Sequence, residues 1–368
     1  MCKKTLAAFV ALSALSVSVW AAQVQLYGLI DQSLMYEAVN AKDGNGRVNT
    51  LYMSSGEEMG SRWGIRGFEE LGNGYQVGFE LQSGFRSDDG TEQYGRIFAR
   101  ESTLYVKGPF GKISAGHMDA IIGTRTSSGK IYFLNAWGDG YGPYNPSMAN
   151  VFSEASYVDN ALFYESPKMA GFTIRAQYSM KMDDVNDTTG VENKASSDRY
   201  AGATITYENG GLKLLLGADT TLYGHDAGED PDNGYTIIGG GMYDFGFMTV
   251  HAGVQYFDSV RSTTIRKLSW TDVPNKLTGW AVTLSTGVPC WGGRFIAAVD
   301  YLDAEEADDA TSEADVKRLV GGVGYQYPLS KRTHLYGILS VGRDTVETDE
   351  GTVHPNYYKA GFGIRHSF

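Results

Sequence analysis

The stretch YYKAGFGIRHSF, residues 357–368, ends the chain and alternates along its whole length. One face of the extended chain would carry Tyr358, Ala360, Phe362, Ile364, His366 and Phe368, and the other Tyr357, Lys359, Gly361, Gly363, Arg365 and Ser367. A period of two is typical of a β-strand, because successive side chains point to opposite faces. The last residue is a large aromatic, whereas most chains end in a frayed, polar segment. The predicted fold must therefore account for an aromatic at the end of its last strand.

The same alternation occurs in SRWGIRGFEE (61–70), GFTIRAQYSM (171–180) and LKLLLGAD (212–219). A soluble β-sandwich has this pattern as well, with one apolar and one wet face. Two further features favour a membrane barrel. Arginine stands beside glycine on the polar faces, which suits a water-filled lumen, and aromatics lie where apolar faces end, which suits girdles at a membrane interface. These aromatics are Tyr36, Tyr52, Trp63, Tyr336 and Tyr358.

The connections between the predicted strands alternate in length. Seven short turns, such as LGNG (71–74), GPFG (108–111) and PCWGG (289–293), alternate with eight longer polar stretches, so sixteen strands are joined. An even number puts both chain ends on one side, where the first and last strands can pair. Closure matters because lipid cannot satisfy a bare strand edge. The sequence therefore predicts one all-β domain, residues 23–368: a transmembrane antiparallel β-barrel of 16 strands, whose second strand begins at about Ser61 and whose rim carries Phe368 outward.

Residues 1–22 have the order of a secretory signal peptide, with two lysines, an apolar run and then two small alanines. Cleavage near Ala22 would export the protein; a buried N-terminal helix is the alternative. Only Cys290 would then remain, so no internal disulfide is possible. The chain has 43 acidic against 31 basic side chains and a net charge of -12, which makes nucleic acid an unsuitable partner.

No pattern in the sequence indicates catalysis, a cofactor or a metal. The six histidines show no paired metal-ligand spacing. The glycine-rich stretches GFGIRH and GGGMYDFG lack the strand, turn and helix context of a nucleotide-binding loop. A nucleophile-elbow pattern is absent as well. We therefore predict neither an enzyme nor a cofactor.

Several stretches together resemble the general diffusion porins of Gram-negative bacteria, of the betaproteobacterial type. VQLYGLIDQSL (24–34), residues 61–85, 98–119 and 159–179, and the closing GFGIRHSF resemble that family's strands in order and spacing. The resemblance implies an outer-membrane homotrimer that passes ions and small hydrophilic solutes. Its partners would be outer-membrane lipid and lipopolysaccharide, and the barrel assembly machinery, which would recognise Phe368. It also implies that the long third loop, about residues 120–158, folds into the lumen.

By the same resemblance, Arg62, Arg66 and Arg100 form a basic wall at the constriction. Arg62 and Arg66 also share a face by alternation, and guanidinium groups stay charged in a narrow site. The opposing carboxylates are expected among Asp139, Glu154 and Asp119, each of which would otherwise be a solvated loop carboxylate. Such walls create a transverse field that orients dipolar solutes. The family often has an arginine just before its sixth strand, where this chain has Tyr157; Tyr157 and Arg175 are expected to line the pore.

Glu101 follows Arg100, so alternation points it outward, and a carboxylate facing lipid is costly. We therefore expect this strand to lie in a subunit contact. Three rival functions stay open. They are a substrate-specific sugar or anion channel guided by inward aromatics such as Tyr27 and Tyr157, an outer-membrane enzyme, and a secreted β-sandwich adhesin.

Overall fold

The computed structural model describes residues 23–40, 46–138, 140, 144–153, 155, 157–183, 189–226, 231–261, 276–307, 314–348 and 351–368. The predicted signal peptide, residues 1–22, lies outside them, and so do the loop carboxylates Asp139 and Glu154. Among the described residues, no helix has both the length and the apolar character needed to span a bilayer.

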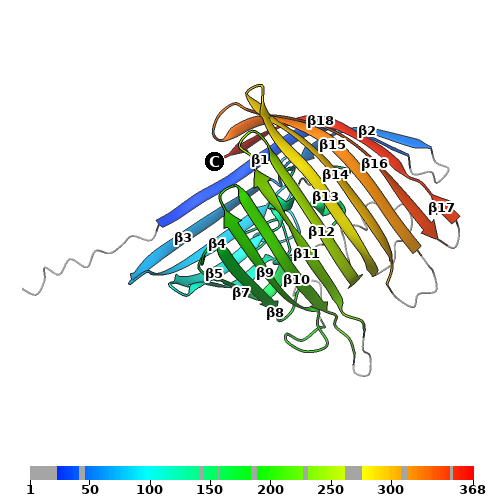
Figure 1. Ribbon diagram of the computed structural model, residues 1–368. Coiled ribbons are helices and arrows are strands. Elements are labelled where there is room, and N and C mark those ends of the chain that lie inside the picture. The colour runs from blue at the N-terminus through cyan, green and yellow to red at the C-terminus, as the bar shows by residue number, and fades with distance from the viewer. Residues whose placement is uncertain are drawn as a thin grey trace, which may run out of the picture.

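The strands form one antiparallel sheet that closes on itself (Figure 1). They are β1 (Gln23–Asn40), β2 (Arg47–Ser55), β3 (Arg62–Gly72), β4 (Tyr75–Gly84), β5 (Glu101–Gly108), β6 (Gly111–Asp119), β7 (Tyr157–Glu165), β8 (Phe172–Ser179), β9 (Arg199–Asn209), β10 (Leu212–Leu222), β11 (Gly234–Asp244), β12 (Thr249–Val260), β13 (Leu277–Cys290), β14 (Gly293–Glu306), β15 (Ala314–Pro328), β16 (Thr333–Thr348), β17 (Gly351–Val353) and β18 (Asn356–Ser367). Two short 3₁₀ helices, η1 (Tyr132–Leu134) and η2 (Met148–Asn150), lie between β6 and β7.

Closure joins the two ends of the described chain. β1 pairs with β18 from Leu29 opposite Ser367 to Asn40 opposite Asn356. The seam continues to the last residue, since the amide of Gly28 donates to the carbonyl of Phe368 at 3.1 Å and the amide of Phe368 donates back at 2.9 Å. Both ends therefore lie at the rim that carries the short turns, as the even strand number predicts.

Two barrel strands are each made of two labelled strands. β2 and β3 pair with successive parts of β1, and β17 and β18 pair with successive parts of β16. Eighteen labelled strands thus make sixteen barrel strands, and the predicted fold class is confirmed. The predicted start of the second strand is wrong: it begins at Arg47 and is interrupted at residues 56–61, which leave the ladder.

The outer surface carries the apolar side of the alternation. Large exposed apolar side chains occur on strands all round the barrel, among them Leu26, Leu104, Ile113, Leu216, Val254, Leu284, Leu339 and Phe362. Tyr36 and Tyr358 are exposed on this face too. Tyr52 and Tyr336 are not part of a girdle, contrary to the prediction, because their hydroxyl groups donate to the carboxylates of Glu37 and Asp31 inside the barrel.

The described residues of the loop between β6 and β7, which are 120–138, 140, 144–153 and 155, lie inside the barrel and are called the inserted loop below. Apolar side chains of this loop and inward side chains of β9 to β15 form one buried cluster. The loop supplies Ile121, Ile122, Ile131, Phe133, Leu134, Met148, Val151 and Phe152, and the wall supplies Tyr200, Leu215, Ile238, Phe257, Ala281, Leu302 and Val320. Burial of this much apolar surface holds the loop against one side of the lumen.

Candidate functional site

Hydrogen bonds tie the inserted loop to inward side chains of the wall. The amide of Ala136 donates to Ser285 Oγ at 2.7 Å, and Asn135 Nδ2 donates to Thr283 Oγ1 at 2.8 Å. Gln255 bonds the loop twice, accepting from the amide of Ser153 at 2.6 Å and donating to its carbonyl at 2.9 Å. Because wall side chains satisfy the loop's backbone, the loop narrows the lumen in one defined position.

A cluster of three guanidinium groups lies where the inserted loop meets β3 and the start of β5. Arg62 Nη1 and Arg100 Nη2 both donate to the carbonyl of Arg125, at 3.4 and 3.1 Å. Arg100 is fully buried, and its Nε donates to Gln82 Oε1 at 2.7 Å. The structure thus brings together Arg62 and Arg100, which the sequence suggested, and adds Arg125, which it did not. We call these three residues the guanidinium cluster.

Tyr157, the first residue of β7, packs beside this cluster. The guanidinium carbons of Arg100 and Arg125 lie 5.9 and 5.8 Å from the centre of its ring. These distances are within the range of a cation–π interaction. Tyr157 therefore borders the positive groups, at the position where an arginine was expected by resemblance.

The structure does not bring Arg66 to the guanidinium cluster. Arg66 lies on the same face of β3 as Arg62, but four residues nearer the short turns, a separation of about 13 Å along a strand. Its side chain is exposed, donates to Gln25 Oε1 at 2.9 and 3.1 Å, and lies over the ring of Tyr27. Arg66 thus lines the wall toward the short-turn rim.

Asp119 ends β6 and is fully buried at the start of the inserted loop. Its Oδ2 accepts from the amide of Arg125 at 2.6 Å, and its Oδ1 lies 3.7 Å from Arg125 Nη1. A side chain on Gly123 or Gly129 would place a Cβ 2.3 Å from Asp119 Oδ2, so only glycine lets the loop fold round this carboxylate. Asp119 therefore compensates and positions Arg125 from the same side of the lumen.

Glu101 points inward, and the predicted outward orientation is wrong. It pairs with the inward Gln82, is buried, and accepts from the amide of Ser127 at 3.2 Å and from the Ser127 hydroxyl. The alternation fails because β5 begins at Glu101, so Arg100 lies in the preceding irregular segment and both side chains can face the lumen. The subunit contact inferred from Glu101 consequently has no basis.

Arg175 lines the wall on β8, next to Thr206. Its Nε donates to Glu165 Oε2 at 2.6 Å and its Nη1 donates to Thr206 Oγ1 at 3.0 Å. Lys130 of the inserted loop lies 4.0 Å from the same carboxylate oxygen of Glu165. Burial lowers the pKa of Lys130, and Glu165 opposes this shift. Arg175 and Lys130 thus add positive charge to the wall, although Glu165 compensates part of it.

Tyr157 also lines a cavity of about 550 Å³. Its wall includes Tyr94, His117 and Tyr157, whose rings are in contact, with centroids 5.7 Å apart for the two tyrosines and 5.5 Å for His117 and Tyr157. His117 Nδ1 lies 2.5 Å from Asp159 Oδ1, and Arg96 Nη1 lies 2.9 Å from the same oxygen. Aromatic and charged groups therefore share this wall. Within the described ranges, no three His, Cys, Asp or Glu side chains are placed to hold a metal ion.

Phe368 ends the seam on the outer face of the barrel. The ring lies over Gly28, where an added Cβ would be 2.5 Å from the ring's Cζ. The side chain is 41% exposed, so it remains accessible from outside while its backbone pairs with β1.

Comparison with known proteins gives a consistent result. A family model described as Gram-negative porin matches residues 5–347. The protein is 30% identical to an outer membrane porin protein of Bordetella pertussis and 27% identical to outer membrane porin protein 32 of Delftia acidovorans, in both cases over the whole of both chains. Among solved structures, an anion-selective porin from Comamonas acidovorans matches 94% of this chain and 100% of its own, with a TM-score of 0.68 and 25% identity.

Proposed function

The chain belongs to the Gram-negative porin family, and from this membership we propose that Arg62, Arg100 and Arg125 form the selective constriction of its pore. The protein is an outer-membrane diffusion channel and not an enzyme, so the family, location and function indicated by the sequence are confirmed. The rival readings of an outer-membrane enzyme and of a soluble adhesin are wrong, because a matched porin family and a closed barrel leave no place for either.

One observation carries the proposal about the constriction: two wall arginines converge on the carbonyl of a third arginine in the inserted loop. Arginine keeps its charge even when partly desolvated, so three positive groups persist where the lumen is narrowed. Asp119 compensates Arg125, so the proposed positive field comes mainly from Arg62 and Arg100. A positive field in a low-dielectric channel raises the local concentration of anions and orients dipolar solutes.

We therefore propose that the pore prefers anions. The solved porin from Comamonas acidovorans is described as anion-selective. Tyr157 occupies the position where the family resemblance implied an arginine. The guanidinium group of Arg125, in the inserted loop, lies 5.8 Å from the centre of its ring. Arg125 can thus supply the positive charge that the family's arginine would have at the position of Tyr157. Asp139 and Glu154 remain proposed opposing carboxylates, and Arg66 and Arg175 remain proposed pore-lining cations.

The double variant Arg62→Ala with Arg100→Ala is expected to lose most of the anion preference, because two of the three positive groups disappear from the proposed constriction. The measurement is the reversal potential of the purified channel in a planar bilayer under a salt gradient. Arg66→Ala is the control for the position on the strand, since it removes one positive charge from the strand that carries Arg62 but outside the cluster, and it should change the reversal potential much less. An unchanged reversal potential in the double variant would refute the assignment.

A substrate-specific channel is the second candidate, and the ring contacts of Tyr94, His117 and Tyr157 at the cavity wall favour it. Aromatic rings with polar neighbours can bind a solute before it reaches the constriction. Saturable block of the ion current by one solute class would support this candidate. A current that is insensitive to added sugars and carboxylates at millimolar concentration would refute the substrate-specific channel and support the general diffusion pore.

We further propose that the channel is a homotrimer, because porins typically form trimers. Planar-bilayer recordings should then show closure in three equal conductance steps, whereas a monomer would close in one step.

Outer-membrane lipid and lipopolysaccharide would surround the outer face, and the barrel assembly machinery would recognise Phe368. Residues 1–22 are proposed as the signal peptide and residues 23–368 as the single mature domain, which N-terminal sequencing of the mature protein would test.

A further inference from the structure

The second barrel strand is interrupted in a way that the barrel itself does not need. β1 pairs with β3 up to Leu29 and with β2 from Gln32 onward, so residues 56–61 occupy a gap of only two β1 residues. The segment leaves the wall and turns into the lumen. Gly56 has a φ of +77°, and a Cβ there would lie 2.7 Å from Gly60 Cα, so the tight turn depends on glycine. We call residues 56–61 the inturned segment.

A buried carboxylate fixes the inturned segment. Asp31 Oδ2 accepts from the amides of Glu58 and Met59 at 2.8 and 2.7 Å, and Asp31 Oδ1 accepts from the Tyr336 hydroxyl at 2.6 Å. The amide of Gly56 donates to the carbonyl of Asp31 at 3.0 Å. These hydrogen bonds fix the backbone of the segment, and with it the orientation of its two glutamates.

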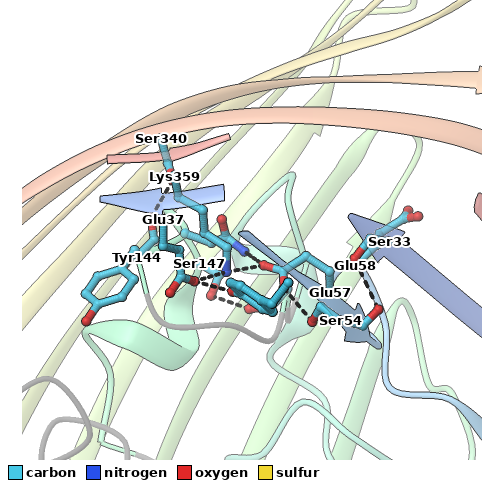
Figure 2. A network of polar contacts seen from close by, with 12 residues as sticks. Ser33, Glu37, Ser54, Glu57, Glu58, Tyr144, Ser147, Ser340 and Lys359 are labelled. Carbon is cyan, nitrogen blue, oxygen red and sulfur yellow. Dashed lines mark hydrogen bonds and ion pairs between the residues drawn. The ribbon is translucent and has the colours of Figure 1, made fainter. Parts of the chain in front are cut away.

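Glu57 reaches the inserted loop. Its Oε1 accepts from Asn145 Nδ2 at 2.7 Å and also from Lys359 Nζ, and its Oε2 accepts from Ser54 Oγ at 3.1 Å. Lys359 lies between two carboxylates, since its Nζ is also 3.2 Å from Glu37 Oε1 (Figure 2). Lys359 has no exposed side-chain surface and Glu57 only 2%. The loop is thus held to the seam strands β1 and β18 through buried charges.

Glu58 points the other way, toward the wall. Its carboxylate accepts from Gln326 Nε2 at 2.6 Å and lies 2.5 Å from His334 Nε2 and 3.3 Å from Arg365 Nη1. The two glutamates of the segment therefore bind different elements. Glu58 holds the segment to β15, β16 and β18, and Glu57 holds the inserted loop.

We propose that the inturned segment is a second element of the constriction, and that Glu57 and Lys359 are positioning residues that keep the inserted loop where the pore conducts. Apolar side chains hold the loop against β9 to β15, and Tyr144 of the loop packs on Tyr357 of β18 with ring centroids 4.3 Å apart. Asn145 and the charged pair add a buried polar contact between the loop and the seam strands. Buried charges are weak anchors unless every partner is present, because an uncompensated buried charge is costly. They also respond to an electric field, which acts on charges moving across a membrane. This inference rests on the proposed function, because the loop narrows the same pore.

The sharpest test is Asn145→Asp, which replaces the amide donor by a carboxylate of the same shape facing Glu57. We expect the single-channel current to break into short openings and partial levels, with the mean open time falling about tenfold, equivalent to 1.4 kcal/mol. Asn145→Asp combined with Glu57→Gln should recover the native open time, because the glutamine amide can donate to the new carboxylate. Asp303→Asn is the control, since it removes a carboxylate from a partly exposed ion pair with Lys317 outside the inturned segment, and it should leave the open time unchanged.

The fold of each variant is checked by its migration on gels before and after heating, since the native barrel resists unfolding by detergent in the cold. Should Asn145→Asp not fold, Glu57→Gln alone tests the proposal, because it removes one of the two charges that hold Lys359 and should shorten the openings. A folded variant with native openings, or a double variant without recovery, would overturn the proposal. Ion selectivity recorded on the same channels reports on the guanidinium cluster, so failure of the positioning role of Glu57 and Lys359 and failure of the proposed function are distinguishable.

Discussion

Asp344→Asn is expected to destabilise the barrel by about 3 to 5 kcal/mol, the usual result of removing one partner from a buried ion pair. Arg318 on β15 and Asp344 on β16 are each 1% exposed and form a bidentate pair, with Nε to Oδ1 and Nη2 to Oδ2 both at 2.9 Å. The remaining donor, Arg318 Nη1, reaches the carbonyl of Asn150 in the inserted loop at 2.7 Å. The variant thus leaves a buried guanidinium without its carboxylate and loosens a loop contact together with it.

The free energy of unfolding can be measured by urea titration of the barrel refolded into lipid vesicles, followed by tryptophan fluorescence. Asp303→Asn is the matched control. Asp303 lies 3.9 Å from Lys317 on the neighbouring strands, and the two side chains are 32% and 50% exposed, so its loss should cost about 1 kcal/mol or less. An equal loss of unfolding free energy in both variants would show that the buried pair contributes no more to stability than the exposed pair. Replacing Arg318 by Met and Asp344 by Leu together should restore much of the stability.

Deletion of Phe368 is expected to lower the amount of folded protein in the outer membrane severalfold. The deletion removes two backbone hydrogen bonds to Gly28, each of which contributes about 1 kcal/mol, and uncovers the edge of β1 at the rim. The quantity to measure is heat-modifiable barrel in isolated outer membranes, compared with the total protein made.

Phe368→Ala separates the backbone contribution from recognition of the ring. The variant keeps both backbone hydrogen bonds, so refolding into vesicles in vitro should be nearly normal. Its level in the outer membrane should nevertheless fall about as far as that of the deletion, if the assembly machinery recognises the exposed ring. Phe368→Trp should restore assembly. Normal outer-membrane levels of Phe368→Ala would contradict the assembly role.

Alternation along single strands predicts the strands, and the arginine–glycine faces, the aromatics and the alternating connection lengths predict the barrel. The two faces of residues 357–368 point as predicted, with Phe362 exposed and Lys359 buried. Turn positions followed from glycine, asparagine and proline between alternating stretches, because these residues stop strands for local steric reasons. Local sequence determines both features, so they could be predicted without knowledge of neighbouring strands.

The candidate site was only partly predictable. Arg62 and Arg100 could be proposed because the resemblance to a family covers the strands that carry them. Arg125 could not, since it lies in a loop without any period, and loop geometry depends on contacts distant in sequence such as those of Asp119 and Tyr157. Glu101 was misplaced because one irregular residue before a strand reverses the side on which every alternating position falls.

The interruption of the second strand was missed for a related reason. The prediction starts the second strand at about Ser61 and so places residues 47–55 in the connection before it. The segment folds inward because Asp31, on another strand and 27 and 28 residues away from Glu58 and Met59, accepts hydrogen bonds from their amides. A single sequence does not show such a partnership.

Pairing between β1 and β18 also determines the order in which strand edges are covered during biogenesis. Residues 23–40 emerge first during export, yet one edge of that strand has no native neighbour until residue 367 has arrived. For this interval the newly exported polypeptide presents an open template that any extended chain nearby could join. We therefore expect maturation to depend on a holding factor in the periplasm, and depletion of that factor should lower the amount of folded protein more than for a smaller protein whose termini meet sooner.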